Sequence, residues 1–441
     1  MAPRMDPVQP SETMPQATSV VVIGGGIAGV STAFFLAKKG IPVVLCEKGI
    51  IGGEQSGRNW GWTRVMGRDA REIPLGLESL KHWRQMNSLT GGETGFRQCG
   101  IAYFADTPKQ LAEYEAWLDT AREFQVDSRL LNSDEAAELM PGAGRRFAGA
   151  LYTPSDGRAE PTKAAPAIAA AVRGLGGTVL TNCAVRGVET KGGRISGVVT
   201  ERGHIKCDSV VLAGGAWSRL FTGNMGAGID LPQLKVLGGA MRTKPLDGLP
   251  EISGGGPDFA FRKRLDGGYS IALRNSSISE ITPDSFRLFR EFLPSLRKSW
   301  RELRLRVGGQ FITEWRMPRH WRMDEISPFE QMRMLDPVPD DSYLRQARNA
   351  VVRAFPGFAK MEEAERWGGL IDVTPDAVPV ISAVESLPGF HLATGFSGHG
   401  FGIGPGAGKL MADIVAGDPA AVDPLPYAFS RFKDGSWRRY V

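Results

Sequence analysis

Three glycines near the start of the chain, Gly24, Gly26 and Gly29, have the spacing G-x-G-x-x-G. Glycines at this spacing let a backbone turn approach a pyrophosphate, because no Cβ stands in the way. Glu47 follows at the end of the next apolar run, where a carboxylate can accept hydrogen bonds from a ribose. The pattern predicts dinucleotide binding, and a structural turn with a surface acid is the alternative. By itself the motif does not distinguish FAD from NAD.

The elements around this motif favour binding. Residues 20–23 form a short β-branched run that is typical of a buried parallel strand. Residues 28–39 predict a helix that ends before Gly40, since glycine commonly follows a helix C-terminus. A second apolar strand is expected at 41–48. A strand, a tight turn and a helix in this order bring the free N–H groups of the helix N-terminus to the phosphates.

A second glycine-rich stretch, GFSGHGFGIGPGAG at 395–408, follows an apolar strand and opens a helix. A second helix start of this kind is redundant in a simple nicotinamide enzyme, whereas FAD has a ring that must be held far from its pyrophosphate. A helix N-terminus near the ring would stabilise negative charge on the reduced flavin. The stretch therefore indicates FAD. Its candidate cofactor contacts are Gly395, Gly398, His399, Gly400, Phe401 and Gly402.

Charge and cysteine content exclude several classes of protein. The 441 residues include 53 Lys and Arg and 48 Asp and Glu, a net charge of +5, and no run of like charges forms a nucleic-acid-binding patch. The four cysteines have no C-x-x-C spacing, so neither a zinc site nor a disulfide framework is predicted. We expect no metal and no nucleic-acid partner, and a weak preference for anionic substrates.

The N-terminal segment and the hydropathy pattern bear on location. Residues 1–17 are polar and contain prolines, which predicts a disordered tail rather than a signal peptide. No stretch is apolar over about eighteen residues, so no transmembrane helix is expected and the predicted location is cytoplasmic. Residues 310–325 place aromatic and apolar residues among basic ones. We expect this segment to pack over the active site or against another subunit, with peripheral membrane contact as the alternative.

The order of the elements predicts two interleaved domains. Periodicity indicates helices at 75–90 and 108–124, with Ser133 as a candidate helix N-cap, and antiparallel strands at 235–275. The predicted fold class is α/β (α+β overall): a Rossmann-like FAD-binding domain interleaved with an antiparallel-sheet substrate domain that carries a helical insertion at about 310–340. The FAD-binding domain is predicted at 18–75, 150–230 and 365–435, and the substrate-binding domain at 76–149 and 231–364.

Four motifs together resemble the D-amino acid oxidase/glycine oxidase/sarcosine oxidase family of flavoproteins, and the resemblance covers residues 18–430. The motifs are GGGIAG with Glu47, GGAWS at 214–218, TPDAVPVI at 374–381 and the second glycine-rich stretch. The resemblance implies FAD and an antiparallel substrate domain over the flavin. Some sarcosine oxidases attach FAD through a cysteine before the T-P-D segment. GGLIDVTPD at 368–376 has no cysteine, so we expect non-covalent FAD.

The chain is more closely similar to bacterial L-amino acid deaminases. EKGIIGGEQSGR at 47–58 and SPFEQMRMLDPVPD at 327–340 resemble stretches of those enzymes, and the second lies in a helical insertion that most of the family lacks. The N-terminal membrane helix of the deaminases has no counterpart here, and the segment after Ser56 differs, with GRNWGWTR at 57–64. That loop lies near the flavin in the family. The substrate and the electron acceptor, oxygen or a quinone, therefore stay open.

Several arginines are candidates for contact with the substrate or the flavin. Similarity to the sarcosine oxidases implies that Arg64 packs on the flavin and that Arg68 meets the substrate carboxylate. Arg262 and Arg274 lie in predicted strands of the substrate domain, where a guanidinium fork could bind a carboxylate, with a surface position as the alternative. His399 is a further candidate at the site, with a hydrogen bond to the backbone as the alternative. The other candidate FAD contacts are Ile27, Ala28, Lys48, Gln55, Ser56, Arg58, Val185, Gly214, Gly215 and Trp217.

The leading hypothesis is an FAD-dependent oxidation of the Cα–N bond of an amino acid. The α-hydrogen leaves as a hydride to flavin N5, and the imine hydrolyses to a keto acid and ammonia. Such a reaction depends on positioning and electrostatics more than on a dedicated base. The alternatives are a D-amino acid, N-methyl amino acid or opine dehydrogenase that passes electrons to a quinone or a partner, and a non-enzymatic FAD-binding subunit of a heteromeric oxidase. The sequence specifies neither the chirality of the substrate nor the oligomeric state.

Overall fold

The structure is a computed structural model that describes residues 2–299 and 303–440. Its first layer is a six-stranded sheet with the order β21-β22-β13-β1-β2-β9. All its pairs are parallel except β21 with β22, which is antiparallel. The strands are β1 (Val20–Ile23), β2 (Val43–Cys46), β9 (Thr178–Leu180), β13 (Ser209–Leu212), β21 (Val380–Ala383) and β22 (Phe390–Thr394).

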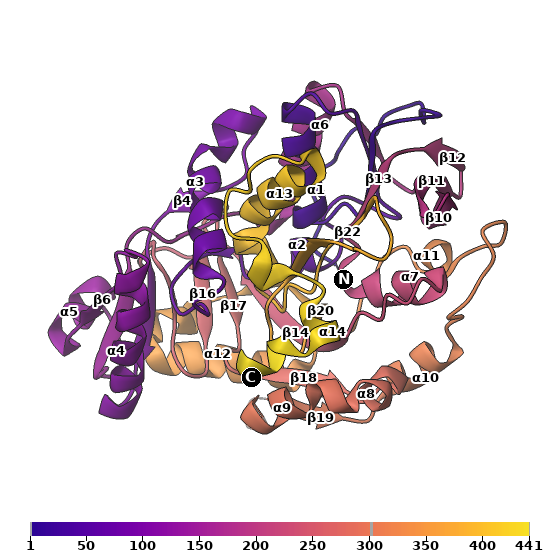
Figure 1. Ribbon diagram of the computed structural model, residues 1–441. Helices are drawn as coiled ribbons and strands as arrows, with labels where there is room; N and C mark the ends of the chain where they lie inside the picture. The colour runs from indigo at the N-terminus through magenta and orange to yellow at the C-terminus, as the bar shows by residue number, and fades with distance from the viewer. Residues whose placement is uncertain (1, 300–302, 441) are drawn as a thin grey trace.

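Both faces of this sheet are covered, as the continuous apolar runs predict. Val20 and Val22 pack into one core and Val21 and Ile23 into another, because successive side chains of β1 point to opposite faces. The first core is closed by four helices that gather in the upper part of Figure 1. These helices are α1 (Ile27–Lys38), α3 (Ile73–Thr90), α6 (Pro161–Gly174) and α13 (Gly400–Ala416).

The opposite face carries a small antiparallel sheet and one helix. The sheet contains β10 (Val185–Lys191), β11 (Arg194–Thr200) and β12 (Gly203–Lys206), and it lies at the right of Figure 1. The helix is α7 (Ser218–Met225), which follows the 3₁₀ turn η1 (Gly215–Trp217). Together they bury the second core of the nucleotide-binding layer.

The second layer is a ten-stranded, mainly antiparallel sheet. Its order is β19-β18-β14-β17-β16-β15-β5-β7-β6, and β20 also pairs with β14. The helix α12 (Asp341–Ala354) packs against it, and α4 (Pro108–Glu123) and α5 (Ser133–Leu139) lie beside β6 at the left of Figure 1. The strands are β5 (Ile101–Ala105), β6 (Arg129–Leu131), β7 (Gly149–Thr153), β14 (Leu234–Thr243), β15 (Ser253–Gly255), β16 (Ala260–Lys263), β17 (Tyr269–Ala272), β18 (Ser277–Glu280), β19 (Leu303–Arg306) and β20 (Glu363–Val373).

Short elements connect the two layers. A three-stranded sheet joins β3 (Trp62–Thr63), β8 (Gly157–Arg158) and β4 (Arg97–Gln98), and α2 (Gln55–Arg58) precedes it. Four helices and the edge strand β19 lie in and before the segment 310–340 that is predicted to be an insertion. The helices lie along the lower edge and right side of Figure 1. They are α8 (Pro283–Arg287), α9 (Phe289–Ser299), α10 (Gly309–Arg316) and α11 (Pro328–Gln331).

The structure corrects three local expectations. The segment before residue 18 is held in place: the Asp6 N–H donates to the Thr162 carbonyl at 3.0 Å and the Ser11 N–H to Val179 at 2.8 Å. The N-cap of α5 is Asn132, which forms a capping box, and Ser133 is the first helical residue. The strand β20, which overlaps the segment predicted for the FAD-binding domain from residue 365, pairs instead with β14 of the second layer.

Within 2–299 and 303–440, no helix combines the length and apolar character needed to cross a bilayer. In the same part of the chain, no group of three or more His, Cys, Asp or Glu side chains is arranged to hold a metal ion.

Candidate active site

A cavity of about 930 Å³ is lined by both layers of the fold. It extends from the carboxyl ends of β1 and β2 to β14 and β18. A crevice at the carboxyl ends of parallel strands is the usual ligand site of such a sheet. Of the residues predicted to bind FAD, these line the cavity: Gly24, Gly26, Ile27, Ala28, Glu47, Lys48, Gln55, Ser56, Arg58, Val185, Gly214, Gly215, Trp217, Gly398, His399, Gly400, Phe401 and Gly402.

The first glycine motif forms the turn between β1 and α1. Gly24 has φ +109°, and a Cβ there would lie 2.4 Å from the carbonyl oxygen of Ala213. Gly29 is absent from the cavity wall because it packs on Gly24: a Cβ at residue 29 would lie 1.9 Å from the Gly24 oxygen. A Cβ at Gly26 would meet only Ser56 Oγ, at 3.1 Å. The turn therefore leaves an open approach to the N-terminus of α1, as a pyrophosphate requires.

Glu47 lies beside this turn and lines the cavity. Its two carboxylate oxygens accept hydrogen bonds from the N–H groups of Gly25 and Gly49, at 2.6 and 2.7 Å. Burial raises the pKa of the carboxyl, while Lys48 and the two N–H donors act in the opposite direction. Each carboxylate oxygen can accept more than one hydrogen bond, so capacity for a ribose hydroxyl remains.

The second glycine-rich stretch forms the N-terminus of α13 at another part of the cavity. Gly398, His399 and Gly400 line the wall there. Gly395 does not line it; the Gly395 N–H donates to the carboxylate of Asp372 at 2.8 Å. Asp372 is buried at the end of β20 and also accepts from Gln233, at 2.9 Å. An isolated acid in the apolar run GGLIDV is the sequence signal that could have identified this residue.

These features fit an FAD molecule. Two helix N-termini and a wall of residues without side chains leave room for a long, anionic cofactor, and Glu47 is suited to a ribose. The N-termini of α1 and α13 both carry the positive end of a helix dipole, which suits phosphates at one and the reduced ring at the other. At the start of α1, the Ile27 N–H donates to the Ser56 hydroxyl at 2.8 Å.

Two arginines lie close to one aromatic ring in the part of the cavity that the second layer lines, and a third lines the same cavity. The guanidinium carbon of Arg274 lies 3.6 Å from the centroid of the Tyr103 ring, and that of Arg64 lies 5.5 Å from it. Arg68 is 5% exposed and lines the same wall. Sequence reasoning missed Tyr103, although its place in the aromatic strand GIAYF was a usable signal.

The Arg68 guanidinium is short of acceptors. Its Nε and Nη1 atoms are buried and have no hydrogen-bond partner among the described residues. Burial, reinforced by the neighbouring charge of Arg64, lowers the pKa of Arg68 to about 10. The group stays charged at neutral pH, and a buried charge without a partner is costly. An anionic ligand in the cavity would offset that cost.

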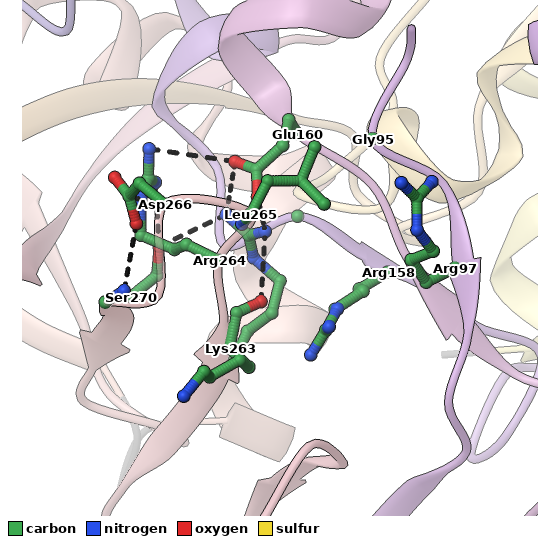
Figure 2. Close-up of polar contacts among 12 residues, drawn as sticks. Gly95, Arg97, Arg158, Glu160, Lys263, Arg264, Leu265, Asp266 and Ser270 are labelled. Atoms are coloured by element: carbon green, nitrogen blue, oxygen red, sulfur yellow. Dashed lines mark hydrogen bonds and ion pairs between the residues drawn. The ribbon is translucent and has the colours of Figure 1, made fainter. Parts of the chain in front are cut away.

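Arg262, in contrast, is a structural residue. Its side chain is fully buried and forms an ion pair with Glu160 at 2.8 Å, outside the cavity. Its Nε donates to the Trp60 carbonyl at 2.6 Å, which holds the loop before β3. Figure 2 shows the polar cluster around Glu160, with Arg264 and Leu265 close to its carboxylate. The expectation that Arg262 contacts the substrate is corrected, because the two terminal nitrogens of its guanidinium group already bond to the carboxylate of Glu160.

The side chain of His399 forms a hydrogen bond with a carboxylate, whereas the sequence suggested a hydrogen bond to the backbone as the alternative to a role at the site. Its Nδ1 lies 3.0 Å from the carboxylate of Glu72, whose side chain is 1% exposed. Burial and the charge of Arg68 lower the pKa of His399, so the ring is neutral at neutral pH. Burial opposes the ionisation of Glu72, but the hydrogen bond from His399 and the charge of Arg68 outweigh it and lower the pKa of Glu72. Glu72, four residues after Arg68, was not predicted.

The insertion contributes an apolar wall. Phe289, Phe292 and Leu293 of α9 and Phe286 of α8 line the cavity, and Phe286 is 69% exposed at its mouth. The expected active-site segment 310–325 does not line the cavity. The amphipathic helix α9 could have been recognised from the sequence FREFLPSL.

Asp156 holds the loop that carries Arg64 and Arg68. Its carboxylate accepts from the Val65 N–H at 2.8 Å and the Met66 N–H at 3.2 Å. The side chain is fully buried, and burial raises the pKa of Asp156 to about 7 although the two N–H donors oppose the shift. The position of the two arginines therefore depends on a carboxyl group that is half protonated near neutral pH.

The chain matches the family described as FAD dependent oxidoreductase (DAO) over residues 19–414, and it belongs to that family. Among solved structures, it is similar to L-amino acid deaminase from Proteus myxofaciens in complex with anthranilate. That structure is 35% identical, with a TM-score of 0.94, and the match covers 98% of this chain and 97% of that one.

Curated relatives include other activities of the same family. Sarcosine dehydrogenase of Mus musculus is 27% identical over 97% of this chain, but the chain spans only 42% of that protein's length. Glycine oxidase of Pseudomonas aeruginosa is 27% identical, and the match covers 93% of this chain and 98% of that enzyme. FAD dependence is common to the family, whereas these names describe different substrates.

The buried carboxyl of Asp156 predicts a pH dependence of stability. Between about pH 4 and pH 7 the folded chain retains a proton that the unfolded chain releases, so Asp156 makes the free energy of unfolding fall as the pH rises. Asp156→Asn removes this titration. We expect the stability of the wild type relative to the variant to decline from pH 4 to pH 7, measured by urea unfolding. Parallel curves for the two proteins across this range would contradict the assignment.

Proposed function

We propose that the protein is an FAD-dependent L-amino acid oxidoreductase of the deaminating type. The amine loses a proton to water, the α-hydrogen leaves as a hydride, and the resulting imino acid reacts with water to give a 2-oxo acid and ammonia. Bound FAD supplies the acceptor for that hydride. The observation that carries the proposal is the buried, unpartnered Arg68 guanidinium in the wall of the same cavity that the two glycine-rich helix starts line.

The residues that would hold FAD lie along one side of the cavity. The α1 N-terminus suits the pyrophosphate, Glu47 the ribose, and the α13 N-terminus the ring. We propose that the cofactor is held without a covalent bond. Cys46 lines the cavity beside the Glu47 end, away from α13, and no other cysteine lines it within the described residues. Cys99, Cys183 and Cys207 lie outside it.

The substrate carboxylate is assigned to Arg68 and Arg274. Both guanidinium groups line the cavity, and a carboxylate can pair with two such groups at once. In a site closed to water, this contact is stronger than it would be in solution. Tyr103 packs against Arg274 and limits the directions that this side chain can take. The substrate would thus be oriented by its carboxylate, with the side chain directed to the apolar wall of α8 and α9.

The residues near α13 do not form an acid–base pair for removing an α-proton. His399 is neutral and its Nδ1 is already engaged by Glu72. A hydride mechanism with a neutral amine does not need such a base. The chain itself positions the amino acid, holds the buried Arg68 as a partner for the substrate carboxylate, and surrounds the reacting carbon with apolar side chains.

Two other activities of the same class have support from relatives. Sarcosine dehydrogenase and glycine oxidase act on donors that their names specify, and both match most of this chain. The 35% identity to an L-amino acid deaminase favours the L-amino acid assignment over these. We propose that either oxygen or a quinone accepts the electrons from the reduced cofactor. The alternative that the chain is one subunit of a heteromeric oxidase is also kept.

Peripheral membrane contact is also retained as a proposal. Val307 is 81% exposed, Ile312 49% and Trp315 68%, and all three lie on or beside α10 in the insertion. Arg316 ends that helix. Exposed apolar side chains with a basic neighbour suit an anionic lipid surface or another protein subunit.

Anaerobic mixing of the FAD-loaded protein with amino acids tests the activity. We expect L-amino acids to bleach the visible absorbance of the flavin and their D-enantiomers to leave it unchanged. Bleaching by sarcosine or glycine, but not by any larger L-amino acid, would support the other activities of the family instead. Absence of bleaching with every L-, D- and N-methyl amino acid would contradict the proposal.

The same measurement with Arg68→Gln tests the carboxylate contact. We expect the apparent dissociation constant for the amino acid to rise about thirtyfold or more, because losing one partner of a buried charge pair costs about 2–5 kcal/mol. Arg84→Gln, at an exposed position of α3, is the matched control and should behave as the wild type. Equal flavin content in all three proteins shows that the cofactor site is intact.

Acid precipitation of the FAD-loaded protein tests the mode of attachment. Among the described residues, Cys46 is the cysteine that lines the cavity, and it adjoins Glu47 rather than the α13 N-terminus proposed to hold the ring. We therefore expect all the FAD to be released into the supernatant. A yellow pellet after precipitation would show a covalent bond and would overturn this part of the proposal.

A further inference from the structure

A second, smaller cavity of about 290 Å³ lies next to the main one. It is bounded by the segment after β17, by the side of α12 and by β19. Residues 273–276 line both cavities, so one short stretch of chain is the partition between them. We call the smaller cavity the outer recess. Its polar lining includes Arg274, Arg304 and Arg353.

The partition is held in a defined conformation. The Tyr343 hydroxyl donates to the carbonyls of Leu273 and Ser276, at 2.9 and 3.1 Å. Asn275 has a left-handed backbone, φ +52°, and its side-chain amide donates to the Pro257 carbonyl at 3.2 Å. A non-glycine residue in this conformation is uncommon and persists only where its surroundings hold it. The partition is therefore a built feature between two cavities.

The charge of the outer recess is positive. Three arginines are among its lining residues, against one acidic residue, Asp258. Arg353 pairs with Asp258 at 3.0 Å, Arg304 donates to Gln346 at 2.8 Å, and Arg274 donates to the Gly256 carbonyl at 3.2 Å. Each guanidinium has five N–H donors, so these contacts leave donors for a ligand. A concave surface lined by one sign of charge concentrates ions of the opposite sign.

We propose that the outer recess is a second binding site for small carboxylates, and that it shares Arg274 with the main cavity. The inference rests on the proposed function, which supplies the ligands: the 2-amino acid that is consumed and the 2-oxo acid that is released. Arg304 and Arg353 line only the recess, whereas Arg274 lines both cavities. A carboxylate in the recess and a carboxylate in the main cavity would therefore both interact with Arg274.

Sharing one cation makes the two sites oppose each other. A carboxylate in the recess engages Arg274 and adds a negative charge close to the main cavity, which weakens binding of the substrate carboxylate there. Coupling between two sites is reciprocal, so the substrate weakens binding in the recess by the same factor. The functional consequence is that accumulated 2-oxo acid in the recess lowers the affinity of the main cavity for the amino acid without having to displace it.

Equilibrium binding tests the site directly. Pyruvate, a small 2-oxo acid, is titrated by calorimetry into the FAD-loaded wild type and into Arg304→Gln/Arg353→Gln. We expect two binding events in the wild type and one in the double variant, with the recess affinity reduced about tenfold or more because two charge-assisted contacts are lost. Arg345→Gln, an exposed position on the same helix α12, is the matched control and should keep both events.

Kinetics tests the coupling. Pyruvate competes with the amino acid in the main cavity of both proteins, but it should raise the apparent dissociation constant for the amino acid more in the wild type than in the double variant, where the recess no longer contributes. Without pyruvate, the affinity of the double variant for the amino acid should stay within about twofold of the wild type. Identical pyruvate binding and identical inhibition in wild type and double variant would overturn the inference. If no amino acid reduces the flavin but pyruvate binding still depends on Arg304 and Arg353, the proposed function fails and the recess site stands.

Discussion

The close approach of α1 to the end of β1 is the constraint on which the site depends. A Cβ at residue 29 would lie 1.9 Å from the Gly24 oxygen, so the helix can reach the sheet only because this residue is glycine. That packing points the helix N-terminus into the cavity beside Glu47. The helix α13 in turn packs closely on α1, because a Cβ at Gly408 would lie 2.4 Å from Ser31. Two helix dipoles thus converge on one cavity, which is why it suits a long anionic cofactor.

The second layer adds positive charge to a cavity that the first layer shapes. Arg68 is buried, and the guanidinium carbons of Arg274 and Arg64 lie 3.6 and 5.5 Å from the centroid of the Tyr103 ring. Two nitrogens of the buried Arg68 guanidinium have no acceptor among the described residues, which raises the free energy of the folded state and favours an anion in the cavity. Asp156 places the loop that carries two of these charges. In the function that we propose, binding and positioning would both be electrostatic, and hydride transfer would need no further base.

Local motifs were predictable from the sequence because their physics is local. The turn at Gly24–Gly29, the helix that ends before Gly40 and the second glycine stretch all depend on backbone geometry within a few residues. All but two of the predicted FAD contacts line the cavity, and Gly29 and Gly395 are absent because they pack the turns themselves. The two-layer architecture followed from the order of strands and helices.

Pairing between distant residues was not predictable. Arg262 and Arg274 looked equivalent, yet Arg262 meets Glu160, about a hundred residues away in the chain, and Arg274 faces the cavity. Glu72 and Asp156 were missed for the same reason. Their roles depend on contacts with distant segments, and the sequence around each residue does not show which segments these are. The segment before residue 18 is polar, but its backbone hydrogen bonds to α6 and β9 hold it in place.

A crystal structure of the FAD-loaded protein with a non-reacting carboxylate bound is the most direct measurement of this account. The account places the flavin ring at the N-terminus of α13, with the ligand carboxylate within hydrogen-bond distance of both Arg68 and Arg274. A carboxylate bound elsewhere in the main cavity, with Arg68 still lacking an acceptor, would contradict it. So would an FAD whose pyrophosphate lies away from the turn at Gly24–Gly29.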